Sequence, residues 1–461
     1  MAVSTTKRAS GEPGDDSANR LNASGASQST EPVMDAATRQ RHLRRAVVAS
    51  TVGTTVEWYD FFLYGSAAAL VFPRLFFSEL DPFVAEMLSW VTFYAGFIGR
   101  PLGAALFGHF GDRVGRKALL VTTMLLMGIS TTAIGLVPAY TAIGMWGAVL
   151  LTLLRALQGM AVGGEWSGSV LMAGEWAPSG RRGFTTSFAQ MGAPLGLIIA
   201  NSALTLMTWV HDEATFLAWG WRVPFLASFI LVAIGLYIRI GVLESPVFAN
   251  IKAQGKVARA PVLDVLRDNW RQVALTTLLR TGQLAPYYIT TTYVLVYGTQ
   301  VLGLSRTTLL TCVTIRSVAG LLAIPIAGHL SDLFGRKRIV GIGCVLTGLW
   351  IFALFEMFDT RAIPLIIFAL VLDGIFQDLQ YGPQAAIIAE NFPASRRYTG
   401  SGLGYHLAAI TAGGPAPLIA TYLFDRYESS FPIALFAMVT VLISLATLPF
   451  LKDRAEGLDQ Q

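Results

Sequence analysis

Long apolar segments follow one another from residue 45 to residue 452, and they limit what this chain can fold into more than any other feature. A helix needs about 20 mainly apolar residues to cross the roughly 30 Å hydrocarbon core of a bilayer. Only 14% of the residues are charged, against about 25% in ordinary soluble domains. The sequence therefore predicts an all-α integral membrane protein and excludes a soluble globular enzyme.

Twelve segments are predicted to be transmembrane helices. They are 46–72, 84–110, 117–138, 142–164, 183–209, 222–241, 271–299, 305–329, 338–357, 363–389, 398–424 and 431–450. The polar residues 1–40, rich in Ser, Ala, Thr and Gly, are predicted to be a disordered cytoplasmic tail. The remaining predicted parts are an N-terminal six-helix bundle (41–241), a cytoplasmic inter-bundle loop (242–270), a C-terminal six-helix bundle (271–452) and a short cytoplasmic tail (453–461).

Lys and Arg are distributed unevenly among the predicted loops. Most lie on the side that holds both chain ends, whereas the opposite side carries Arg74, Arg306, Arg361 and Arg426. Because the cytoplasmic loops of membrane proteins carry the excess of Lys and Arg, both termini are predicted to be cytoplasmic, with the chain in the cell (plasma or inner) membrane. The net charge of +5 is then a topology signal and not a nucleic-acid-binding surface.

One motif occurs in both halves of the chain. Gly108–Lys117 reads Gly-His-Phe-Gly-Asp-Arg-Val-Gly-Arg-Lys, and Gly328–Lys337 reads Gly-His-Leu-Ser-Asp-Leu-Phe-Gly-Arg-Lys. A second pair of similar stretches, Glu175–Arg182 and Glu390–Arg397, follows the fourth and the tenth predicted span. A duplication of six spans in parallel orientation is typical of transporters, whose substrate binds at the interface of the two halves.

The repeated motif is predicted to be a conformational latch between the bundles. Its first glycine allows close helix approach. Its aspartate can pair with arginine or accept hydrogen bonds from a helix N-terminus, where the helix dipole favours a carboxylate. The alternative is a basic loop that only fixes topology. The predicted latch residues are Gly108, Asp112, Arg113, Gly115, Arg116, Lys117, Gly328, Asp332, Gly335, Arg336 and Lys337.

Further stretches carry a resemblance to a known family. Glu57–Gly65 reads Glu-Trp-Tyr-Asp-Phe-Phe-Leu-Tyr-Gly, Arg155–Glu165 reads Arg-Ala-Leu-Gln-Gly-Met-Ala-Val-Gly-Gly-Glu, and Trp219–Pro224 reads Trp-Gly-Trp-Arg-Val-Pro. With the repeated motif, these stretches resemble the metabolite:proton symporter family of the major facilitator superfamily over about residues 45–452. The resemblance implies twelve helices in two bundles and proton-coupled uptake of a small metabolite such as shikimate, 2-oxoglutarate, citrate, proline or glycine betaine.

Span one carries two carboxylates and a phenol on one helix face, because Glu57, Asp60 and Tyr64 recur at i, i+3 and i+7. Ionisable groups inside a membrane are costly, so each is a candidate for function. Two close carboxylates resist ionising together, which favours protonation of one of them. We interpret Glu57 and Asp60 as proton-coupling residues. Structural pairing with arginines of other spans is the alternative.

Span four presents Arg155 and Gln158 on one face. The resemblance marks Arg155 as the span-four arginine of proton-coupled relatives. Its guanidinium can hold a substrate carboxylate through two hydrogen bonds or neutralise Glu57 or Asp60 between transport steps. We therefore assign Arg155 to both proton coupling and substrate binding. A permanent buried ion pair is the alternative.

The second half adds polar side chains that are predicted to face a central cavity. Arg280 lies in span seven, where Pro286 is expected to bend the helix. Asp373, Gln377, Gln380 and Gln384 form a stripe along span ten, and Tyr405 and His406 lie in span eleven. The predicted substrate-binding residues are Tyr64, Arg155, Gln158, Arg280, Gln377, Gln380 and Tyr405.

Motifs for other chemistry are missing from the sequence. It has no Walker-type phosphate loop, no His-Glu-x-x-His and no cysteine cluster. We therefore predict a secondary transporter that needs no cofactor and no metal, is driven by the proton gradient, and has no nucleic-acid partner and no obligate protein partner. The predicted partners are protons, the lipid bilayer and a small substrate. The predicted substrate is an organic acid, such as shikimate or a dicarboxylate. A zwitterionic osmolyte such as proline or glycine betaine, held by Trp58 or Tyr59 beside Glu57, is the alternative.

Overall fold

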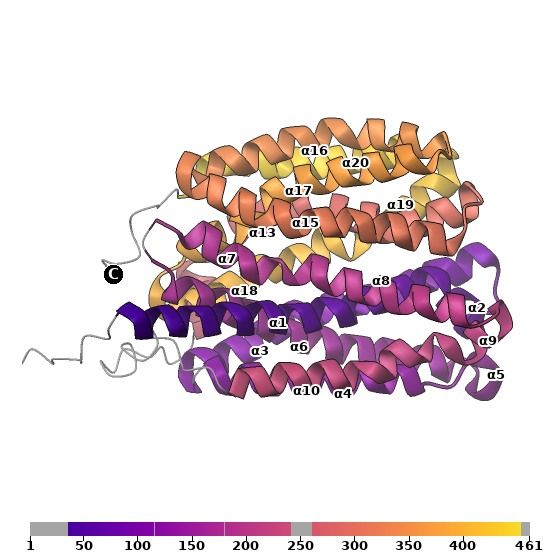
Figure 1. The fold of residues 1–461 in the computed structure, drawn as a ribbon, viewed down its shortest axis with the longest axis horizontal. Helices are drawn as coiled ribbons and strands as arrows, with labels where there is room; N and C mark the ends of the chain where they lie inside the picture. Colours follow the sequence, from indigo (N-terminus) through magenta and orange to yellow (C-terminus); the bar gives the residue numbers. More distant parts are fainter. Residues whose placement is uncertain (1–35, 115, 179, 241–260, 453–461) are drawn as a thin grey trace, which may run out of the picture. The chain divides into compact units, whose positions relative to one another are not determined.

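The computed structural model describes residues 36–114, 116–178, 180–240 and 261–452. The chain divides into a short unit, Met1–Gln40, and a large unit, Arg41–Gln461. The predicted tails lie outside the described residues except for 36–40, and so does most of the predicted inter-bundle loop. Every regular element in the described part is helical, and the long helices of the large unit run side by side (Figure 1).

The helices fall into two sets along the sequence, here called the N bundle and the C bundle. The N bundle contains α1 (Ala36–Leu70), α2 (Phe72–Phe76), α3 (Pro82–Val114), α4 (Arg116–Leu136), α5 (Tyr140–Ile143), α6 (Trp146–Trp176), α7 (Arg182–Gln190), α8 (Gly192–Val210), α9 (Glu213–Thr215), η1 (Phe216–Gly220) and α10 (Arg222–Ile240). The C bundle contains α12 (Pro261–Asp268), α13 (Trp270–Tyr288), η2 (Ile289–Tyr293), α14 (Val294–Val296), η3 (Tyr297–Val301), α15 (Arg306–Phe334), α16 (Arg336–Asp359), α17 (Ile363–Glu390), η4 (Ala394–Arg396), α18 (Arg397–Ala408), η5 (Ala409–Gly413), α19 (Pro415–Tyr427), α20 (Phe431–Thr447) and η6 (Leu448–Phe450).

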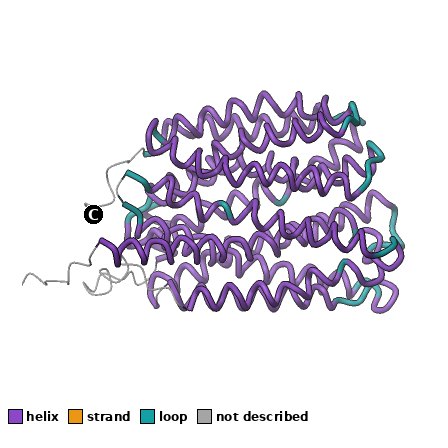
Figure 2. The backbone as a smooth tube through the Cα atoms, in the orientation of Figure 1, coloured by secondary structure: helices purple, strands orange, loops and turns teal. Residues whose placement is uncertain are grey.

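Each of the twelve predicted spans coincides with one long helix or with a run of helices that follow one another directly. Eight of the described segments are long and apolar enough to cross a membrane by length and composition, and a ninth is the bent pair Glu213–Gly220 and Arg222–Ile238. The loops lie mainly at the two ends of the helices (Figure 2). A further helix that was not predicted, α12, folds inside the predicted inter-bundle loop. Its Val265 is fully buried, and the helix packs against α18 and α3.

Three spans are interrupted where the sequence disfavours a regular α-helix. Pro286 lacks the N–H that would bond to Gly282, and α13 passes into the π-helical turn η2 two residues after it. The π-helical turn η5 precedes Pro415 in the eleventh span, and in the fifth span α7 ends at Gln190, two residues before Gly192. After Pro286 the structure shows a change of helix type, and the bend expected there stays a prediction. Such turns are frequent at functional sites.

Small residues bring α3 and α6 into backbone contact. A Cβ atom built on Gly103 would lie 1.8 Å from the Met160 carbonyl oxygen, and one built on Gly159 would lie 1.9 Å from the Gly96 carbonyl oxygen. Close backbone approach at small residues is how membrane helices gain packing energy without a hydrophobic driving force. The polar side chains of α3 and α6 described below are therefore held at a fixed mutual spacing.

We expect Gly103→Ala to separate α3 from α6 and to destabilise the folded protein by about 2 kcal/mol or more, because backbone atoms cannot yield as a side chain can. The measurement is thermal unfolding of the detergent-solubilised protein. Gly341→Ala is the matched control, because its Cβ would meet Leu448 at an ordinary 3.5 Å. Equal melting temperatures for the two variants would contradict the predicted backbone contact.

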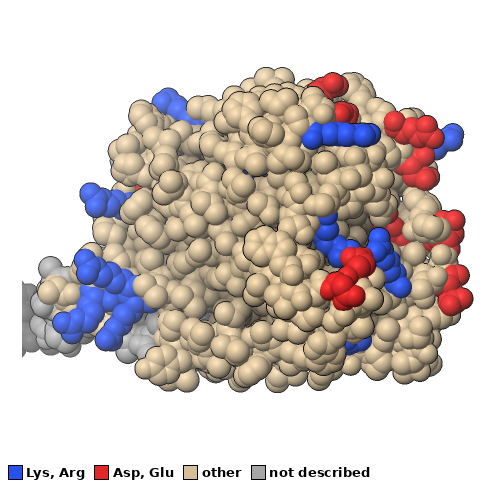
Figure 3. All heavy atoms as spheres, turned by 45° about the vertical axis from the view of Figure 1, so that its right-hand side comes forward, with Lys and Arg blue, Asp and Glu red and all other residues tan. Residues whose placement is uncertain are grey.

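Charged side chains gather at the two ends of the helices. The end at which α7, α16 and α18 begin, here called the basic end, carries Arg181, Arg182, Arg336, Lys337, Arg338, Arg396 and Arg397. The other end, here called the acidic end, carries Glu79, Asp81, Asp212, Glu213, Asp359, Asp425 and Glu428. A broad band with few charges separates the two ends (Figure 3). This is the surface expected of helices surrounded by lipid.

Candidate functional site

The first polar cluster lies in the N bundle, between α1 and α6. Asp60 and Arg155 are both fully buried, and the charge of Arg155 acts on Asp60. Arg155 donates to Gln158, whose amide donates to Thr131 at 2.7 Å. The Thr131 side chain lies near the Asp60 carboxyl group, but neither Asp60 oxygen has a hydrogen bond of normal geometry in the described part of the chain. The structure thus brings the predicted acid and the predicted arginine together, and it leaves the acid poorly stabilised as an anion.

The other predicted residues of span one lie on the same fully buried stretch of α1. Glu57 is one turn from Asp60 towards the basic end, and Tyr64 is one turn towards the acidic end. The Tyr64 hydroxyl donates to Thr92 at 2.8 Å, and its ring centroid lies 4.4 Å from the guanidinium carbon of Arg155. Asp60 and Tyr64, one turn apart on the predicted face of span one, therefore both border Arg155.

A second arginine, Arg100 on α3, joins this cluster. The guanidinium carbons of Arg100 and Arg155 each lie 4.0 Å from the ring centroid of Phe61. Both arginines are at most 1% exposed, and each has Nε and Nη2 without a hydrogen-bond partner among the described residues. Cation–π contacts stabilise the two charges only in part. These buried donors remain able to bind an anion.

The third arginine of the centre, Arg280 on α13, organises a cluster in the C bundle. It donates to Gln283 at 2.7 Å, to Gln384 of α17, and to the Tyr405 hydroxyl of α18. Tyr381 lies 3.4 Å from the same hydroxyl. Arg280 Nε and Gln384 Nε2 are buried and have no acceptor in the described part. The structure thus joins the predicted Arg280 and Tyr405 and adds Gln384 and Tyr381 to them.

Two of the predicted glutamines of span ten point to different neighbours. Gln377 accepts from Arg316 at 3.0 Å and donates to Asp373 at 2.7 Å. Gln380 instead donates to Thr347 of α16 at 2.9 Å and accepts from the Cys344 thiol. Hydrogen bonds to α16 hold the Gln380 amide away from the Arg280 cluster. The stripe predicted from the sequence is thus divided between two environments.

Sequence reasoning missed Arg316, which lies on α15 and is 3% exposed. The available signal was an arginine ten residues after Arg306 in a segment that must cross the hydrocarbon core. The same argument had identified Arg155 and Arg280.

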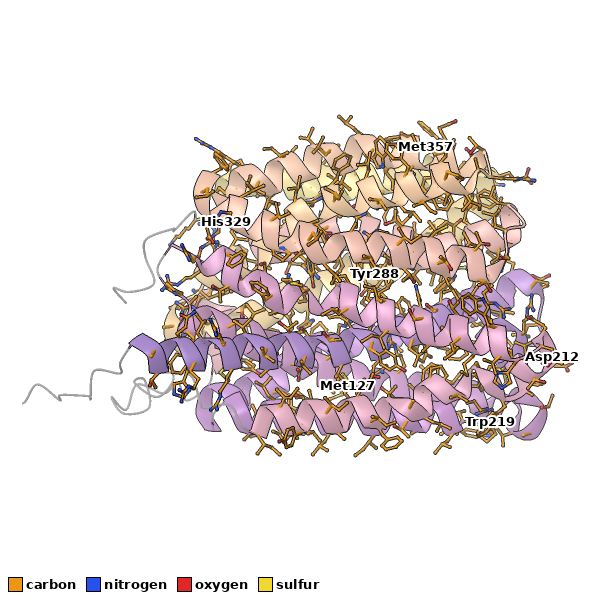
Figure 4. All side chains as sticks on the ribbon, in the orientation of Figure 1. Met127, Asp212, Trp219, Tyr288, His329 and Met357 are labelled. Atoms are coloured by element: carbon orange, nitrogen blue, oxygen red, sulfur yellow. The ribbon has the colours of Figure 1, made fainter. Side chains whose placement is uncertain are left out.

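Aromatic side chains fill the space between the N-bundle and C-bundle clusters. Tyr288 of α13 lies in the middle of the molecule (Figure 4). Its ring centroid is 5.7 Å from that of Phe61, 6.0 Å from that of Phe93 and 5.0 Å from that of Phe97. These rings cross the seam between the bundles, so a movement of one bundle against the other changes this packing.

The bundles are joined tightly near the basic end. The Trp166 ring of α6 stacks on the Tyr405 ring with centroids 3.5 Å apart. Gln190 of α7 accepts from Trp166 at 2.9 Å and donates to the Tyr381 carbonyl oxygen at 3.2 Å. The Tyr398 hydroxyl donates to the Gly164 carbonyl oxygen. These contacts close the seam on the basic side of the arginine clusters.

A cavity of about 1490 Å³ lies at the acidic end. Both bundles line it, with Glu86 and Thr208 from the N bundle and Tyr293, Gln300 and Thr421 from the C bundle. A volume of this size is larger than ordinary small-molecule pockets of about 300–1,000 Å³. The seam is therefore closed at one end and hollowed at the other.

The latch motif of the second half makes the contact expected of it. Asp332 accepts from the backbone N–H groups of Gly183 and Phe184, in the first turn of α7, at 2.9 and 2.8 Å. Arg336 forms two ion pairs, with 3.3 Å between its Nη1 and Asp332 Oδ1 and 2.6 Å between its Nη2 and Glu390 Oε1. An aspartate of the C bundle thus binds a helix N-terminus of the N bundle, where the dipole favours its charge.

The structure describes some of the remaining latch residues and leaves others undescribed. A Cβ on Gly328 would lie 2.7 Å from the Gly183 carbonyl oxygen, and one on Gly108 would lie 3.1 Å from Thr399 Oγ1, so both glycines lie at close approaches. Gly335 has φ +94° between α15 and α16, and Lys337 donates to the Pro449 carbonyl oxygen at 3.4 Å. Gly115 and the side chains of Asp112, Arg113, Arg116 and Lys117 lie outside the described residues.

We expect Asp332→Asn to loosen the start of α7. The amide offers one acceptor oxygen without charge, so the two backbone bonds lose roughly 1–2 kcal/mol. Hydrogen–deuterium exchange of the Gly183 and Phe184 amides should then become about 5–30-fold faster. Mass spectrometry of the peptide that covers α7 measures the exchange rate. The control is Glu356→Gln, which changes an exposed residue of α16. Unchanged exchange would show that Asp332 does not hold α7 in solution.

Comparison with known proteins agrees with this architecture. Residues 45–276 match the family described as Sugar (and other) transporter, and residues 299–461 match the Major Facilitator Superfamily. The chain is 40% identical to the inner membrane metabolite transport protein YhjE of Escherichia coli, over 83% of this chain and 88% of that one. It is 38% identical to the shikimate transporter of Escherichia coli (89% and 94% covered) and 30% identical to its proline/betaine transporter (90% and 84% covered).

A solved structure of the proton:xylose symporter XylE superposes with a TM-score of 0.73 at 18% identity, covering 91% of this chain and 96% of that one. This likeness confirms the predicted twelve-helix fold. The family models and the relatives confirm the family predicted from the motifs, and they confirm that the chain is a transporter and not an enzyme. The chain therefore belongs to the major facilitator superfamily and is a multi-pass membrane transporter of the sugar- and metabolite-carrying type.

Proposed function

We propose that this transporter takes up a small organic acid together with protons by alternating access. The acid is shikimate or a similar carboxylate, the driving force is the proton gradient, and no cofactor is needed. The protein lies in the inner membrane with its basic end and both termini in the cytoplasm, as the uneven distribution of Lys and Arg indicates.

The buried guanidinium groups carry the argument for an anionic substrate. Arg100, Arg155 and Arg280 lie in the centre of the large unit, and each has N–H donors without an acceptor in the described part of the chain. A buried donor left without an acceptor costs free energy, and a carboxylate satisfies several such donors at once. Gln384 and Tyr405 beside Arg280 provide hydrogen bonds to hydroxyl groups. The shikimate transporter of Escherichia coli is among the relatives.

Asp60 supplies the proton-coupling step. Its carboxyl group is buried beside Arg155 and lacks hydrogen bonds of normal geometry among the described residues. In low dielectric such a group is favoured in its protonated form unless Arg155 neutralises it. A substrate anion that binds Arg155 takes this neutralisation away. Binding of the anion therefore favours protonation of Asp60, with Glu57 one turn away as the second acid.

The contacts at the seam support alternating access. Asp332, Tyr405 and Gln190 close the basic end, whereas the cavity opens the acidic end. Transporters of this architecture work by rocking one bundle against the other around a central site. With the basic end in the cytoplasm, as proposed, a conformation that is open at the acidic end faces away from the cytoplasm.

A zwitterionic substrate is the second candidate. Phe61, Phe93, Phe97 and Tyr288 form a group of aromatic rings in contact with one another, and aromatic faces attract quaternary ammonium groups. The proline/betaine transporter of Escherichia coli is also a relative, at lower identity than the shikimate transporter.

The test is uptake by purified protein in proteoliposomes with an imposed inward proton gradient. Shikimate, 2-oxoglutarate and glycine betaine are compared, each with and without a protonophore. We expect accumulation of an acid that the protonophore abolishes. Accumulation of glycine betaine alone would replace the organic acid with the zwitterion. Accumulation that is insensitive to the protonophore would contradict proton symport.

A further inference from the structure

The C bundle contains a second buried cluster of acids and arginine, separate from the Arg280 cluster. Arg316 Nη2 lies 3.8 Å from Asp373 Oδ2, and both side chains are at most 4% exposed. Gln377 bridges them, because its amide accepts from Arg316 and donates to Asp373. Arg316 Nε and Asp373 Oδ1 have no hydrogen-bond partner in the described part of the chain. The pair is thus loose, and each partner retains an unused polar atom.

A second carboxylate, Asp378, lies next to this pair. It is 5% exposed, and Arg316 and Asp373 are the charged groups that act on it. Arg316 is also the charged group that interacts with Asp373, and the neutral side chains of Thr290 and Gln377 are its hydrogen-bond neighbours. Other elements also pack against α17. Tyr287 of α13 interacts electrostatically with Arg316 and Asp378. The Cys344 thiol of α16 donates a hydrogen bond to Gln380. At the basic end, α18 presents Tyr405, which Arg280 holds. Two acids therefore face one guanidinium among these groups.

This imbalance has a consequence inside a membrane. One guanidinium can neutralise one carboxylate, and a second ionised carboxylate would add an uncompensated charge in low dielectric. Two acids whose charges act on each other beside one guanidinium titrate as a coupled pair, which retains one proton while the other acid is neutralised. A permanent structural ion pair would need only one of the two acids.

The position of Asp378 links the cluster to the seam between the bundles. Its Oδ2 lies 3.0 Å from the Cβ position at Gly320 of α15, and the same position lies 3.6 Å from Pro194 of α8. Because α8 and α15 pack against each other across the seam, rocking of the bundles changes what covers Asp378. Thr290, 3.2 Å from Gln377, belongs to the π-helical turn η2, so the other side of the cluster is also an irregular element.

We propose that Asp373 and Asp378, facing the guanidinium of Arg316, share one exchangeable proton and form a second proton-binding site in the C bundle. The site is distinct from the Asp60–Arg155 pair of the N bundle. Its use in symport rests on the proposed function, whereas the presence of the proton does not. When the seam between α8 and α15 opens, water reaches Asp378 and the proton can leave.

The test is infrared spectroscopy of the purified protein at neutral pH without substrate. A protonated carboxyl group has a carbonyl stretching band that a carboxylate lacks. Solvent-exposed Asp and Glu are ionised at this pH, because their pKa values lie near 4. Asp373→Asn and Asp378→Asn are each compared with the wild type, and Glu356→Gln, which removes an exposed acid of the same bundle, is the control.

We expect each single variant to remove the same one band, because the remaining acid then pairs with Arg316 and ionises. The band should shift in deuterated water if the proton exchanges. Bands of unchanged intensity in both variants would overturn the proposal, and so would a band that does not shift. If one variant fails to fold, loss or retention of the band in the other variant still tests the proposal. Asp60→Asn should leave this band in place, because Arg155 neutralises Asp60 when no substrate is bound, so a failure of the N-bundle pair is distinguishable from a failure of this site.

Discussion

Asp60→Asn is expected to abolish uphill transport while substrate exchange continues. The amide resembles the protonated acid in shape and charge, so the variant is fixed in the proton-loaded form. It can still bind substrate and pass between its two conformations with substrate bound. It cannot return a proton, and the gradient therefore no longer drives accumulation.

The size of the effect follows from the gradient. A difference of one pH unit stores about 1.4 kcal/mol per proton, which supports about tenfold accumulation of substrate. For the wild type in proteoliposomes we expect accumulation that approaches this ratio. For Asp60→Asn we expect a ratio of about one, with counterflow of labelled substrate within about threefold of the wild-type rate.

The matched control is Glu356→Gln, which removes an exposed carboxylate of α16 and should leave both activities unchanged. Glu57→Gln separates the two acids of span one. If it abolishes accumulation while Asp60→Asn does not, the coupling proton belongs to Glu57. Accumulation at the wild-type level in both variants would remove the N-bundle pair from the mechanism.

The sequence allowed the main parts of the fold to be predicted, because a membrane leaves few choices. Apolar segments of sufficient length must be helices, and the repeated glycine- and aspartate-containing motif had to occupy equivalent positions in the two halves. The contact of Asp332 with the start of α7 followed from the same reasoning, since a carboxylate near a helix N-terminus is a general arrangement. Buried charge likewise pointed to Asp60, Arg155 and Arg280.

The side-chain partners were not predictable to the same degree. Helical periodicity placed Gln377 and Gln380 on one broad face, but the neighbouring helices decide where each amide bonds. Gln377 meets Arg316 of α15, and Gln380 meets Thr347 of α16. Arg316 was missed because a single arginine in an apolar span has no periodic pattern around it. The contact between Trp166 and Tyr405 joins residues from opposite bundles, which no local pattern reveals.

Arg280→Lys is expected to weaken substrate binding far more than it affects folding. Lysine keeps the positive charge at this position. It cannot reproduce the planar guanidinium that reaches Gln283, Gln384 and Tyr405 together. We expect KM for the organic acid to rise about 10–100-fold, which corresponds to roughly 1.4–2.8 kcal/mol. The rate at saturating substrate should change much less, because the predicted proton pair of the N bundle is untouched.

Initial uptake rates over a range of substrate concentrations measure this effect. Arg338→Lys, an exposed arginine at the basic end, is the matched control for the chemical change. A raised KM at constant kcat would identify Arg280 as a residue that binds substrate equally in the ground and transition states. A lowered kcat with an unchanged KM would mean instead that Arg280 acts on the conformational change through Tyr405, which stacks on Trp166 across the seam. The anionic substrate would then have to be held by Arg155 and Arg100, which both retain N–H donors without a partner among the described residues and whose guanidinium carbons each lie 4.0 Å from the ring centroid of Phe61.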